Sequence, residues 1–225
     1  MTAMMSLRSR LALAKLALHA RSDQLDVDRL APLINAGVDL LVLGGTGDEA
    51  ADAGTLRAFR EVYARTPLLL ATDNGDAAEE ASADVVHLVK PGWKLWGSYP
   101  KGHEWTLLGR HTCDARTVRK PGDDWDYLFV GPLREDEFEA HPLREALAEQ
   151  PPFAADALPW FALGAFQLSA VENLLGMGVR RIALTGDVLD AAEPVASVAG
   201  IRAALNRAWD NDEAARAYRL SAAAL

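Results

Sequence analysis

The chain has 225 residues, half of them hydrophobic, and a formal net charge of −9 at pH 7, which excludes nucleic acid as an expected partner because phosphate backbones are bound mainly by clustered lysine and arginine. Its single cysteine, Cys113, excludes an intramolecular disulfide and is typical of a reducing cytosol. No run reaches the roughly 18 uninterrupted apolar residues of a membrane span, and the apolar run at 16–18 is too short for a signal-peptide core, so we expect a soluble cytoplasmic protein.

Apolar runs typical of buried strands alternate with helical patterns along the chain. The sequence predicts strands over 15–19, 38–43, 68–71, 84–88, 106–108, 126–130, 160–163 and 181–184. It predicts helices over 26–36, 53–64, 77–81, 115–119, 142–149 and 169–177, with a final helical region from 195 onward. Gly37 and Gly178 each follow a predicted helix, at the position where glycine commonly ends one.

Eight strand–helix units of this size favour an α/β fold, the closed parallel (β/α)8 TIM barrel, because strands separated by helices are joined by right-handed crossovers. No linker marks a domain boundary, so residues 1–225 are interpreted as a single barrel domain. Several predicted strands run into glycine-containing turns, at Gly44-Gly45-Thr46, Gly131 and Gly164. Since barrel enzymes carry their chemistry on the loops that follow the strands, these turns predict a functional rim.

The strand-end motifs resemble those of the thiamine phosphate synthases and their TenI-like thiazole tautomerase relatives. The matching segments occur in the family's order over roughly 30–205, at 83–88, 109–110, 126–127, 131–132 and 162–164. The resemblance implies a (β/α)8 barrel and, in active members, transfer of a pyrimidine methyl diphosphate onto a thiazole phosphate with Mg²⁺. It implies a small phosphate-bearing ligand as the partner and leaves the oligomeric state open.

The chain departs from the family at the diphosphate-binding positions. Where the family has Gln, Arg and Lys after its second strand, this chain has Val42, Gly44 and Thr46. Losing those donors is expected to remove much of the electrostatic stabilisation of a leaving diphosphate. The turn at Gly44, Gly45 and Thr46 is still predicted to bind a ligand through its backbone amides. The same prediction is made for Gly131, Gly164 and Gly186, at the ends of the last three strands.

Asp73 and His111 are the candidate catalytic residues. Asp73 matches the family's Mg²⁺ ligand, but the second carboxylate is missing from 89–92, so one carboxylate would make a poor site. Its alternative is a cap or turn residue before the helix at 77–81. In the tautomerases a histidine transfers the proton. Depending on a short gap, it aligns with Cys113 or with His111, and His111 can act as a general acid or base near neutral pH. A histidine kept for structural hydrogen bonds is the alternative.

The segment 90–105 holds three of the six tryptophans, together with three lysines. It follows the fourth predicted strand without helical or strand periodicity, so we interpret it as a lid over the barrel mouth, with Lys90, Trp93 and Trp96 as ligand-binding residues. A structural plug and an interaction surface are the alternatives.

Three functions follow from these patterns. The first is a thiamine phosphate synthase-like barrel acting in thiamine biosynthesis or salvage, with most catalytic residues replaced. The second is a catalytically inactive barrel that binds a small ligand or a protein partner. The third is an isomerase similar to the thiazole tautomerases. The resemblance in fold does not decide among them, because function depends on the site rather than on the barrel.

Overall fold

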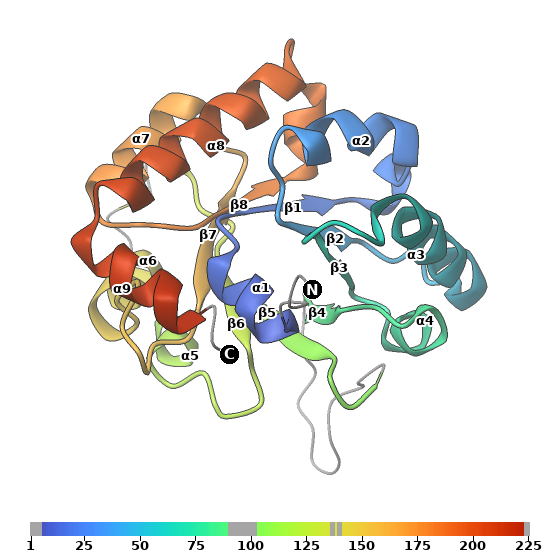
Figure 1. Ribbon diagram of the computed structural model, residues 1–225, viewed down its shortest axis with the longest axis horizontal. Helices are drawn as coiled ribbons and strands as arrows, with labels where there is room; N and C mark the ends of the chain where they lie inside the picture. The colour runs from blue at the N-terminus through green and yellow to red at the C-terminus, as the bar shows by residue number, and fades with distance from the viewer. Residues whose placement is uncertain (1–5, 90–102, 136–137, 139–140, 223–225) are drawn as a thin grey trace.

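The protein is described here from a computed structural model covering residues 6–89, 103–135, 138 and 141–222. Eight parallel strands close into a barrel in chain order, and β8 pairs with β1 (Figure 1). This closure confirms the predicted (β/α)8 fold. The strands are β1 (Leu16–Ala20), β2 (Leu40–Leu43), β3 (Leu69–Thr72), β4 (Val85–Leu88), β5 (Leu107–Thr112), β6 (Tyr127–Val130), β7 (Trp160–Gly164) and β8 (Ile182–Thr185).

The helices lie outside the barrel, most of them around its wall and α1 across one end (Figure 1). They are α1 (Leu7–Leu13), α2 (Val27–Asn35), α3 (Glu49–Tyr63), α4 (Gly75–Ala81), α5 (Ala115–Arg119), α6 (His141–Glu149), α7 (Leu168–Gly176), α8 (Pro194–Asp210) and α9 (Glu213–Ala222), with short 3-10 turns η1 (Ser22–Gln24) and η3 (Gly186–Asp190). Within the described ranges, no helix combines the length and the apolar character that crossing a membrane requires.

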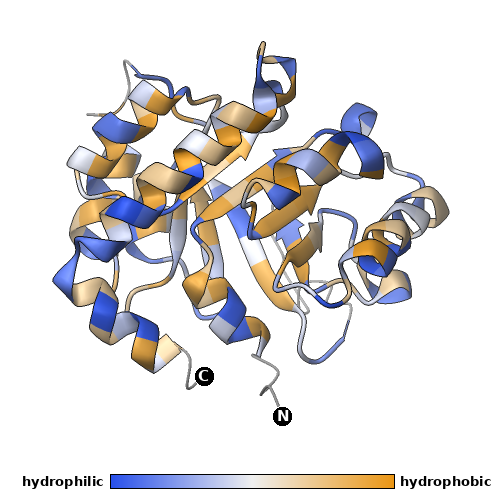
Figure 2. Ribbon diagram, turned by 45° about the horizontal axis from the view of Figure 1, so that its top comes forward, coloured by the Kyte–Doolittle hydropathy of each residue, from blue (hydrophilic) through white to orange (hydrophobic). Residues whose placement is uncertain are grey.

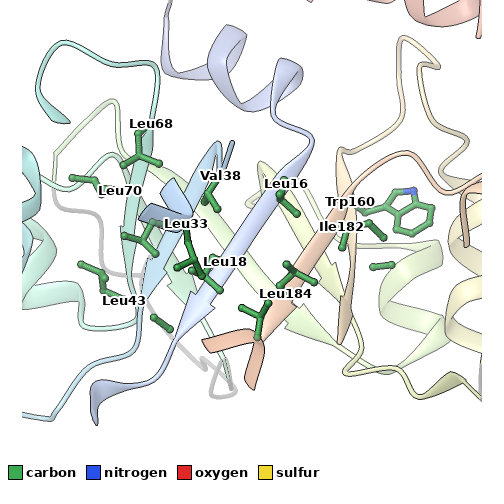
Figure 3. Packing of buried hydrophobic residues seen from close by; sticks show 14 of the residues in the cluster. Leu16, Leu18, Leu33, Val38, Leu43, Leu68, Leu70, Trp160, Ile182 and Leu184 are labelled. Atoms are coloured by element: carbon green, nitrogen blue, oxygen red, sulfur yellow. The ribbon is translucent and has the colours of Figure 1, made fainter. Parts of the chain in front are cut away.

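The barrel wall separates two apolar cores, because successive residues of a strand point to opposite faces. The inner core contains Val42, Leu69, Phe129 and Phe161 among others. The outer core lies between the strands and the helices, where Leu16, Leu18 and Ile182 pack near Leu33 of α2 and Trp160 of β7 (Figure 3). Both faces of the strands are therefore buried, which explains their continuous apolar runs.

The helices turn an apolar side to the strands and a polar side to water (Figure 2). In α2, for example, Leu30, Leu33 and Ile34 are buried, while Asp26 caps the first turn by accepting hydrogen bonds from the amides of Asp28 and Arg29. Such a cap stabilises a helix by about 1 kcal/mol. Helix α3 begins at Glu49 rather than at the predicted residue 53, because Asp48 caps it by accepting from the Ala51 amide.

Two features of the fold were not predicted. Helix α1 precedes the first strand and packs Leu11 against the inner core, so that it covers the amino-terminal end of the barrel. The final helical region is divided at 211–212 into α8 and α9. The strand–helix alternation gave no signal for α1, since its role depends on the barrel end that it covers.

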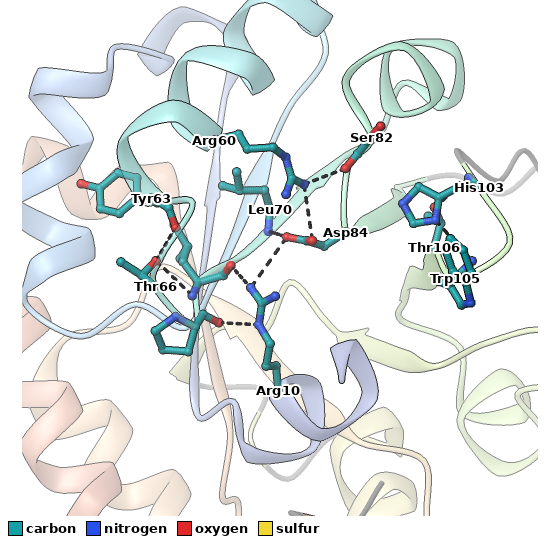
Figure 4. Close-up of polar contacts among 12 residues, drawn as sticks. Arg10, Arg60, Tyr63, Thr66, Leu70, Ser82, Asp84, His103, Trp105 and Thr106 are labelled. Atoms are coloured by element: carbon teal, nitrogen blue, oxygen red, sulfur yellow. Dashed lines mark hydrogen bonds and ion pairs between the residues drawn. The ribbon is translucent and has the colours of Figure 1, made fainter. Parts of the chain in front are cut away.

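Arg10 fastens α1 to the barrel (Figure 4). Its Nε donates to the carbonyl of Pro67 at 3.0 Å, and its terminal nitrogen donates to the carbonyl of Leu68. The same guanidinium lies 3.9 Å from Asp84, whose other neighbours are Arg60 at 3.4 Å and the amide of Leu70 at 2.9 Å. One arginine thus joins α1 to the beginnings of β3 and β4.

Candidate functional site

Three histidines face the inside of the barrel near the carboxyl ends of their strands. They are His19 of β1, His87 of β4 and His111 of β5. Their ring centroids lie 4.9 Å apart for His87 and His111, 5.2 Å for His19 and His111, and 6.1 Å for His19 and His87. We call these residues the histidine cluster. Strand register creates it, because His19 pairs with Val42 and His111 pairs with Phe129, both of the inner core.

The predicted strand 106–108 was too short, since β5 continues to Thr112 and His111 lies within it rather than in the following loop. His111 lies at the carboxyl half of β5, paired with Phe129 of the inner core. His19 and His87 were not proposed as site residues. The signal that would have found them is the alternation along each strand, which places His19 on the face of Ala17, and His87 on the face of Val85.

Aromatic side chains hold the histidine cluster from the amino-terminal side. The hydroxyl of Tyr127 lies 2.6 Å from Nδ1 of His87, and the two rings are stacked with centroids 5.4 Å apart. Phe129 lies 4.4 Å from His87 between ring centroids. Gly109 leaves the space for Tyr127, because a Cβ at that position would lie only 2.2 Å from the tyrosine ring. The position of His87 is therefore fixed by packing and by one hydrogen bond.

Burial keeps the histidine cluster uncharged. It lowers the pKa of His87 well below the ordinary value, with repulsion from His111 and His19 adding to the effect. Burial, with a smaller contribution from His19, lowers the pKa of His111 to about 3. The pKa of His19 is also lowered by burial, against the opposing charge of Asp73. Among the described residues, Nε2 of His87 and Nε2 of His111 are buried and have no hydrogen-bond partner.

The glycine-rich turn after β2 uses its amides within the protein. The amide of Gly44 donates to the carbonyl of Ala20 at 2.9 Å. The amide of Gly45 donates to Oδ1 of Asp73 at 2.5 Å, and the amide of Thr46 donates to Oδ1 of Asp52 at 2.8 Å. A ligand that bound to these amides would have to displace an existing acceptor at each of them.

Asp52 is a rim residue that the sequence did not reveal. It lies on α3, is 4% exposed, and also accepts hydrogen bonds from the Thr46 hydroxyl at 2.8 Å and from Nδ2 of Asn74 at 2.9 Å. Burial opposes ionisation, yet the hydrogen bonds from Thr46 and Asn74 hold the pKa of Asp52 below its ordinary value. Asp52 therefore joins the turn after β2 to the turn after β3.

Asp73 lies at the same rim, directly after β3, and Asn74 rather than Asp73 caps α4. One carboxylate oxygen of Asp73 is already occupied by the Gly45 amide. In the parts of the chain that the structure describes, no group of three or more His, Cys, Asp or Glu side chains is arranged to hold a metal ion. The residues described here do not fit a magnesium ion held by the protein alone.

The predicted glycines at the ends of β6, β7 and β8 are required by close packing. A Cβ would lie 2.4 Å from the Leu163 carbonyl at Gly131, 2.5 Å from the Phe166 ring at Gly164, and 1.9 Å from the Gln24 side chain at Gly186. Gly131 also has a φ of +143°, which favours glycine. These contacts explain why glycine stands at each position, and binding of a ligand there stays a prediction.

The carboxylate of Asp187, next to Gly186, is paired rather than free to repel an anion. It lies 2.8 Å from a terminal nitrogen of Arg21 and accepts a hydrogen bond from the Thr185 hydroxyl at 2.7 Å. Arg21 also lies 3.3 Å from Asp23. Arg21 follows β1, so this charge network closes the rim between the first and last strands.

The predicted ligand-binding residues Lys90, Trp93 and Trp96 lie outside the described residues. Of the same segment, Trp105 is described: it is 70% exposed, and its amide donates to Nδ1 of His103 at 3.3 Å (Figure 4). The lid interpretation of 90–105 stays a prediction.

A cavity of about 1100 Å³ lies at the opposite end of the barrel. It is lined by Leu11 of α1, Tyr218 of α9 and residues of the segments 120–126 and 150–159. Its lining includes the charged side chains of Arg8, Lys120 and Asp156, but (β/α)8 enzymes keep their active sites at the carboxyl ends of the strands. The rim with the histidine cluster is therefore the candidate functional site.

No model of a protein family matches the chain. Curated proteins do match it over most of its length. It is 30% identical over 214 residues to a thiamine-phosphate synthase of Thermobifida fusca, covering 88% of this chain and 94% of that protein. It is 30% identical over 220 residues to a thiamine-phosphate synthase of Mycobacterium tuberculosis, covering 89% and 98%, and 27% identical over 216 residues to one of Saccharopolyspora erythraea, covering 88% and 96%.

Among solved structures, thiamine phosphate pyrophosphorylase from Pyrococcus furiosus superposes on the chain with a TM-score of 0.70. The match covers 90% of this chain and 99% of that one at 16% identity, which supports the barrel fold. The chain thus belongs to the thiamine-phosphate synthase family.

Proposed function

We propose that the barrel binds a phosphate-bearing thiamine precursor at its carboxyl-terminal rim and forms thiamine phosphate slowly or not at all. The observation that supports this proposal most directly concerns the turn after β2. Neither Val42 of β2 nor Gly44 and Thr46 of the turn provides a cation, and the turn's amides already donate within the protein. A leaving diphosphate needs donors and positive charge where its own charge develops, and a rim without them stabilises that charge poorly.

Mg²⁺ has little support as a resident ion at this rim. Magnesium usually keeps several waters and takes one or two carboxylates together with substrate phosphates. Asp73, the residue at the family's metal position, has one oxygen engaged by the Gly45 amide. The proposed binding of a phosphorylated precursor therefore does not depend on a metal ion held by the protein.

An isomerase similar to the thiazole tautomerases is the second candidate, and His111 favours it. A neutral imidazole has one nitrogen that donates a proton and one that accepts, which is what moving a proton between two atoms of a ring requires. However, a pKa of about 3 makes His111 a weak base before ligand binds. This candidate therefore needs a ligand that raises the pKa of His111.

The binding test is a thermal melt with thiazole phosphate, pyrimidine methyl diphosphate and thiamine phosphate as separate ligands. A ligand at about 100 times its Kd stabilises the folded state by about 2.7 kcal/mol. We expect at least one of the three to raise the melting temperature. The rise should be smaller for His111→Gln. It should be unchanged for His103→Gln, because His103, although part of the segment 90–105, lies just before β5 at the amino end of that strand. No shift with any ligand would contradict the proposal.

The activity test mixes the two precursors, with Mg²⁺ added, and measures thiamine phosphate. We expect a rate far below that of ordinary enzymes. Turnover on the order of 1 per second or more would show that other residues have replaced the missing cations, and the argument from the turn after β2 would be wrong.

A further inference from the structure

Among the described residues that point into the barrel, the histidine cluster is the part of the mouth that can acquire positive charge. Along the carboxyl halves of the eight strands, the inward-facing residues that can be protonated to cations are His19, His87 and His111. His87 is fully buried, whereas His19 and His111 are partly exposed and can contact a ligand from the mouth. Arg21, the described arginine after β1, is already paired with Asp187 and Asp23.

Resting on the proposed function, we propose that a phosphate or diphosphate anion binds against His19 and His111 and that its binding draws protons from solvent onto the histidine cluster. The histidines would then supply, only in the bound state, the positive charge that the turn after β2 lacks. No covalent bond to the ligand is formed or broken: each proton taken up adds to the unprotonated nitrogen of a neutral imidazole, and N–H groups of His19 and His111 donate to phosphate oxygens.

The geometry leaves bare nitrogens for this purpose. Nδ1 of His87 lies against the Tyr127 hydroxyl, so Nε2 is the nitrogen of His87 that remains without a partner. Nε2 of His111 is likewise buried and unpartnered among the described residues. A buried polar atom without a hydrogen-bond partner is unfavourable. Protonation beside an anion would give such nitrogens a hydrogen-bonding role.

The charged and titratable groups around the histidine cluster are few. Asp73, after β3, faces His19 and favours its protonated form. Tyr127, from β6, faces His87 with its hydroxyl. The inward residues at the same level of β2, β7 and β8 are Val42, Leu163 and Thr185, which carry no charge. Among the described residues, the remaining influences come from the histidines themselves: His111 and His19 lower the pKa of His87, and His19 lowers the pKa of His111.

The direction of the pH dependence follows from linkage. Without ligand, burial keeps the histidines neutral at pH 7, and the pKa of His111 is about 3. A bound anion favours the charged form and raises these pKa values. Between the free and the bound pKa the complex holds more protons than the free protein, so affinity increases as pH falls. Each proton taken up changes the affinity by about tenfold per pH unit.

The experiment is isothermal titration calorimetry of the full chain with inorganic pyrophosphate at several pH values between about 8 and 5. Each titration is run in two buffers of different ionisation enthalpy, which gives the number of protons taken up. His19→Gln and His111→Gln are compared with the unchanged protein and with the control His103→Gln. Because pyrophosphate itself titrates in this range, the result is the difference between each variant and the unchanged protein.

We expect the unchanged protein and His103→Gln to take up more protons than His19→Gln and His111→Gln, and to gain more affinity on acidification. Equal proton uptake in all four proteins, or no pyrophosphate binding at any pH, would overturn the inference. If a variant does not fold, the imidazole NMR signals of the unchanged protein decide. A shift toward the protonated form on adding pyrophosphate supports the inference, and unchanged signals contradict it.

The same titrations with thiazole phosphate separate this inference from the proposed function. Tight thiazole phosphate binding without extra proton uptake would leave the proposed function standing and would overturn proton-coupled binding. Proton-coupled pyrophosphate binding, with no binding of any thiamine precursor, would overturn the proposed function and leave proton-coupled binding standing.

Discussion

At the scale of single residues, the interior of the barrel mouth combines polar rings with an apolar wall. His87 has no exposed surface and lies between Tyr127 and Phe129. Neutral imidazoles are tolerated there because at least one nitrogen of His87 is hydrogen-bonded. Two quantities can therefore be measured: the stability that the hydrogen bond contributes, and the pH dependence of stability that reports the protonation state of the histidines.

Tyr127→Phe should destabilise the protein by about 1–3 kcal/mol, because Nδ1 of His87 loses its partner while remaining buried. Chemical denaturation gives the free energy of unfolding. The double variant with Tyr127→Phe and His87→Leu should be destabilised by less than the sum of the two single changes, since it leaves no unpaired nitrogen. A Tyr127→Phe variant as stable as the unchanged protein would show that the hydrogen bond contributes no net stability.

His111→Gln should flatten the pH dependence of stability between pH 7 and 5. The pKa of His111 is lowered from 6.5 to about 3 on folding, so below pH 6.5 the unfolded chain binds the extra proton. The stability that neutral His111 contributes is therefore fully present above pH 6.5 and is lost as the pH falls below that value. Removing His111 should reduce that loss by on the order of 1–2 kcal/mol at pH 5, after allowing for its partial exposure.

The measurement for His111→Gln is urea denaturation at a series of pH values, with His103→Gln as the matched control. Parallel curves for His111→Gln and the unchanged protein would mean that His111 is not held neutral by burial.

At the scale of elements, the two ends of the barrel are built differently. The carboxyl end is joined by side-chain carboxylates, with Asp52 and Asp73 holding the turn after β2. The amino end is covered by α1, which Arg10 anchors to backbone carbonyls (Figure 4). The turn after β2 is therefore held by hydrogen bonds that do not involve the inward-facing residues of the strands.

Arg10→Ala should destabilise the protein by about 1–3 kcal/mol, because two backbone carbonyls lose their donor. The effect should lie toward the lower end, since Asp84 keeps Arg60 and the Leu70 amide as partners. The matched control is Arg8→Ala, which removes an ion pair to Asp126 from a side chain that is 72% exposed and should change stability little. Equal melting temperatures for the two variants would show that Arg10 does not anchor α1.

At the scale of the whole molecule, the amino-end cavity and the candidate functional site lie at opposite ends of the barrel. The cavity is lined by α1 and α9, whereas the histidine cluster stands near the carboxyl ends of β1, β4 and β5. The affinity for a ligand that binds at one end should therefore not change when side-chain volume is altered at the other end.

Ala217→Trp tests this separation. Ala217 is an exposed residue of α9 that lines the amino-end cavity, so the indole should occupy part of that space without disturbing the barrel. We expect the Kd of pyrophosphate to stay within about twofold, a change of less than 0.5 kcal/mol. A large loss of affinity in Ala217→Trp, with none in His111→Gln, would place the ligand at the amino end.

The sequence by itself determined the barrel, because the alternation of continuous apolar runs with helical patterns is local and can be recognised in each segment alone. It also indicated the rim, since glycines after β2, β6 and β7 mark where strands end. It placed His111 near the mouth through one motif. The ends of elements were less accurate, because caps such as Asp48 and the length of β5 depend on neighbouring segments.

Only the tertiary structure decided which side chains meet. His19, His87 and His111 are distant in sequence, and barrel closure with its register brings their rings to within 4.9–6.1 Å. Likewise, Asp52 joins two turns because α3 packs beside the end of β3. Periodicity fixes the face on which a residue lies, but contact across a barrel depends on strand order, stagger and closure, which no local pattern encodes.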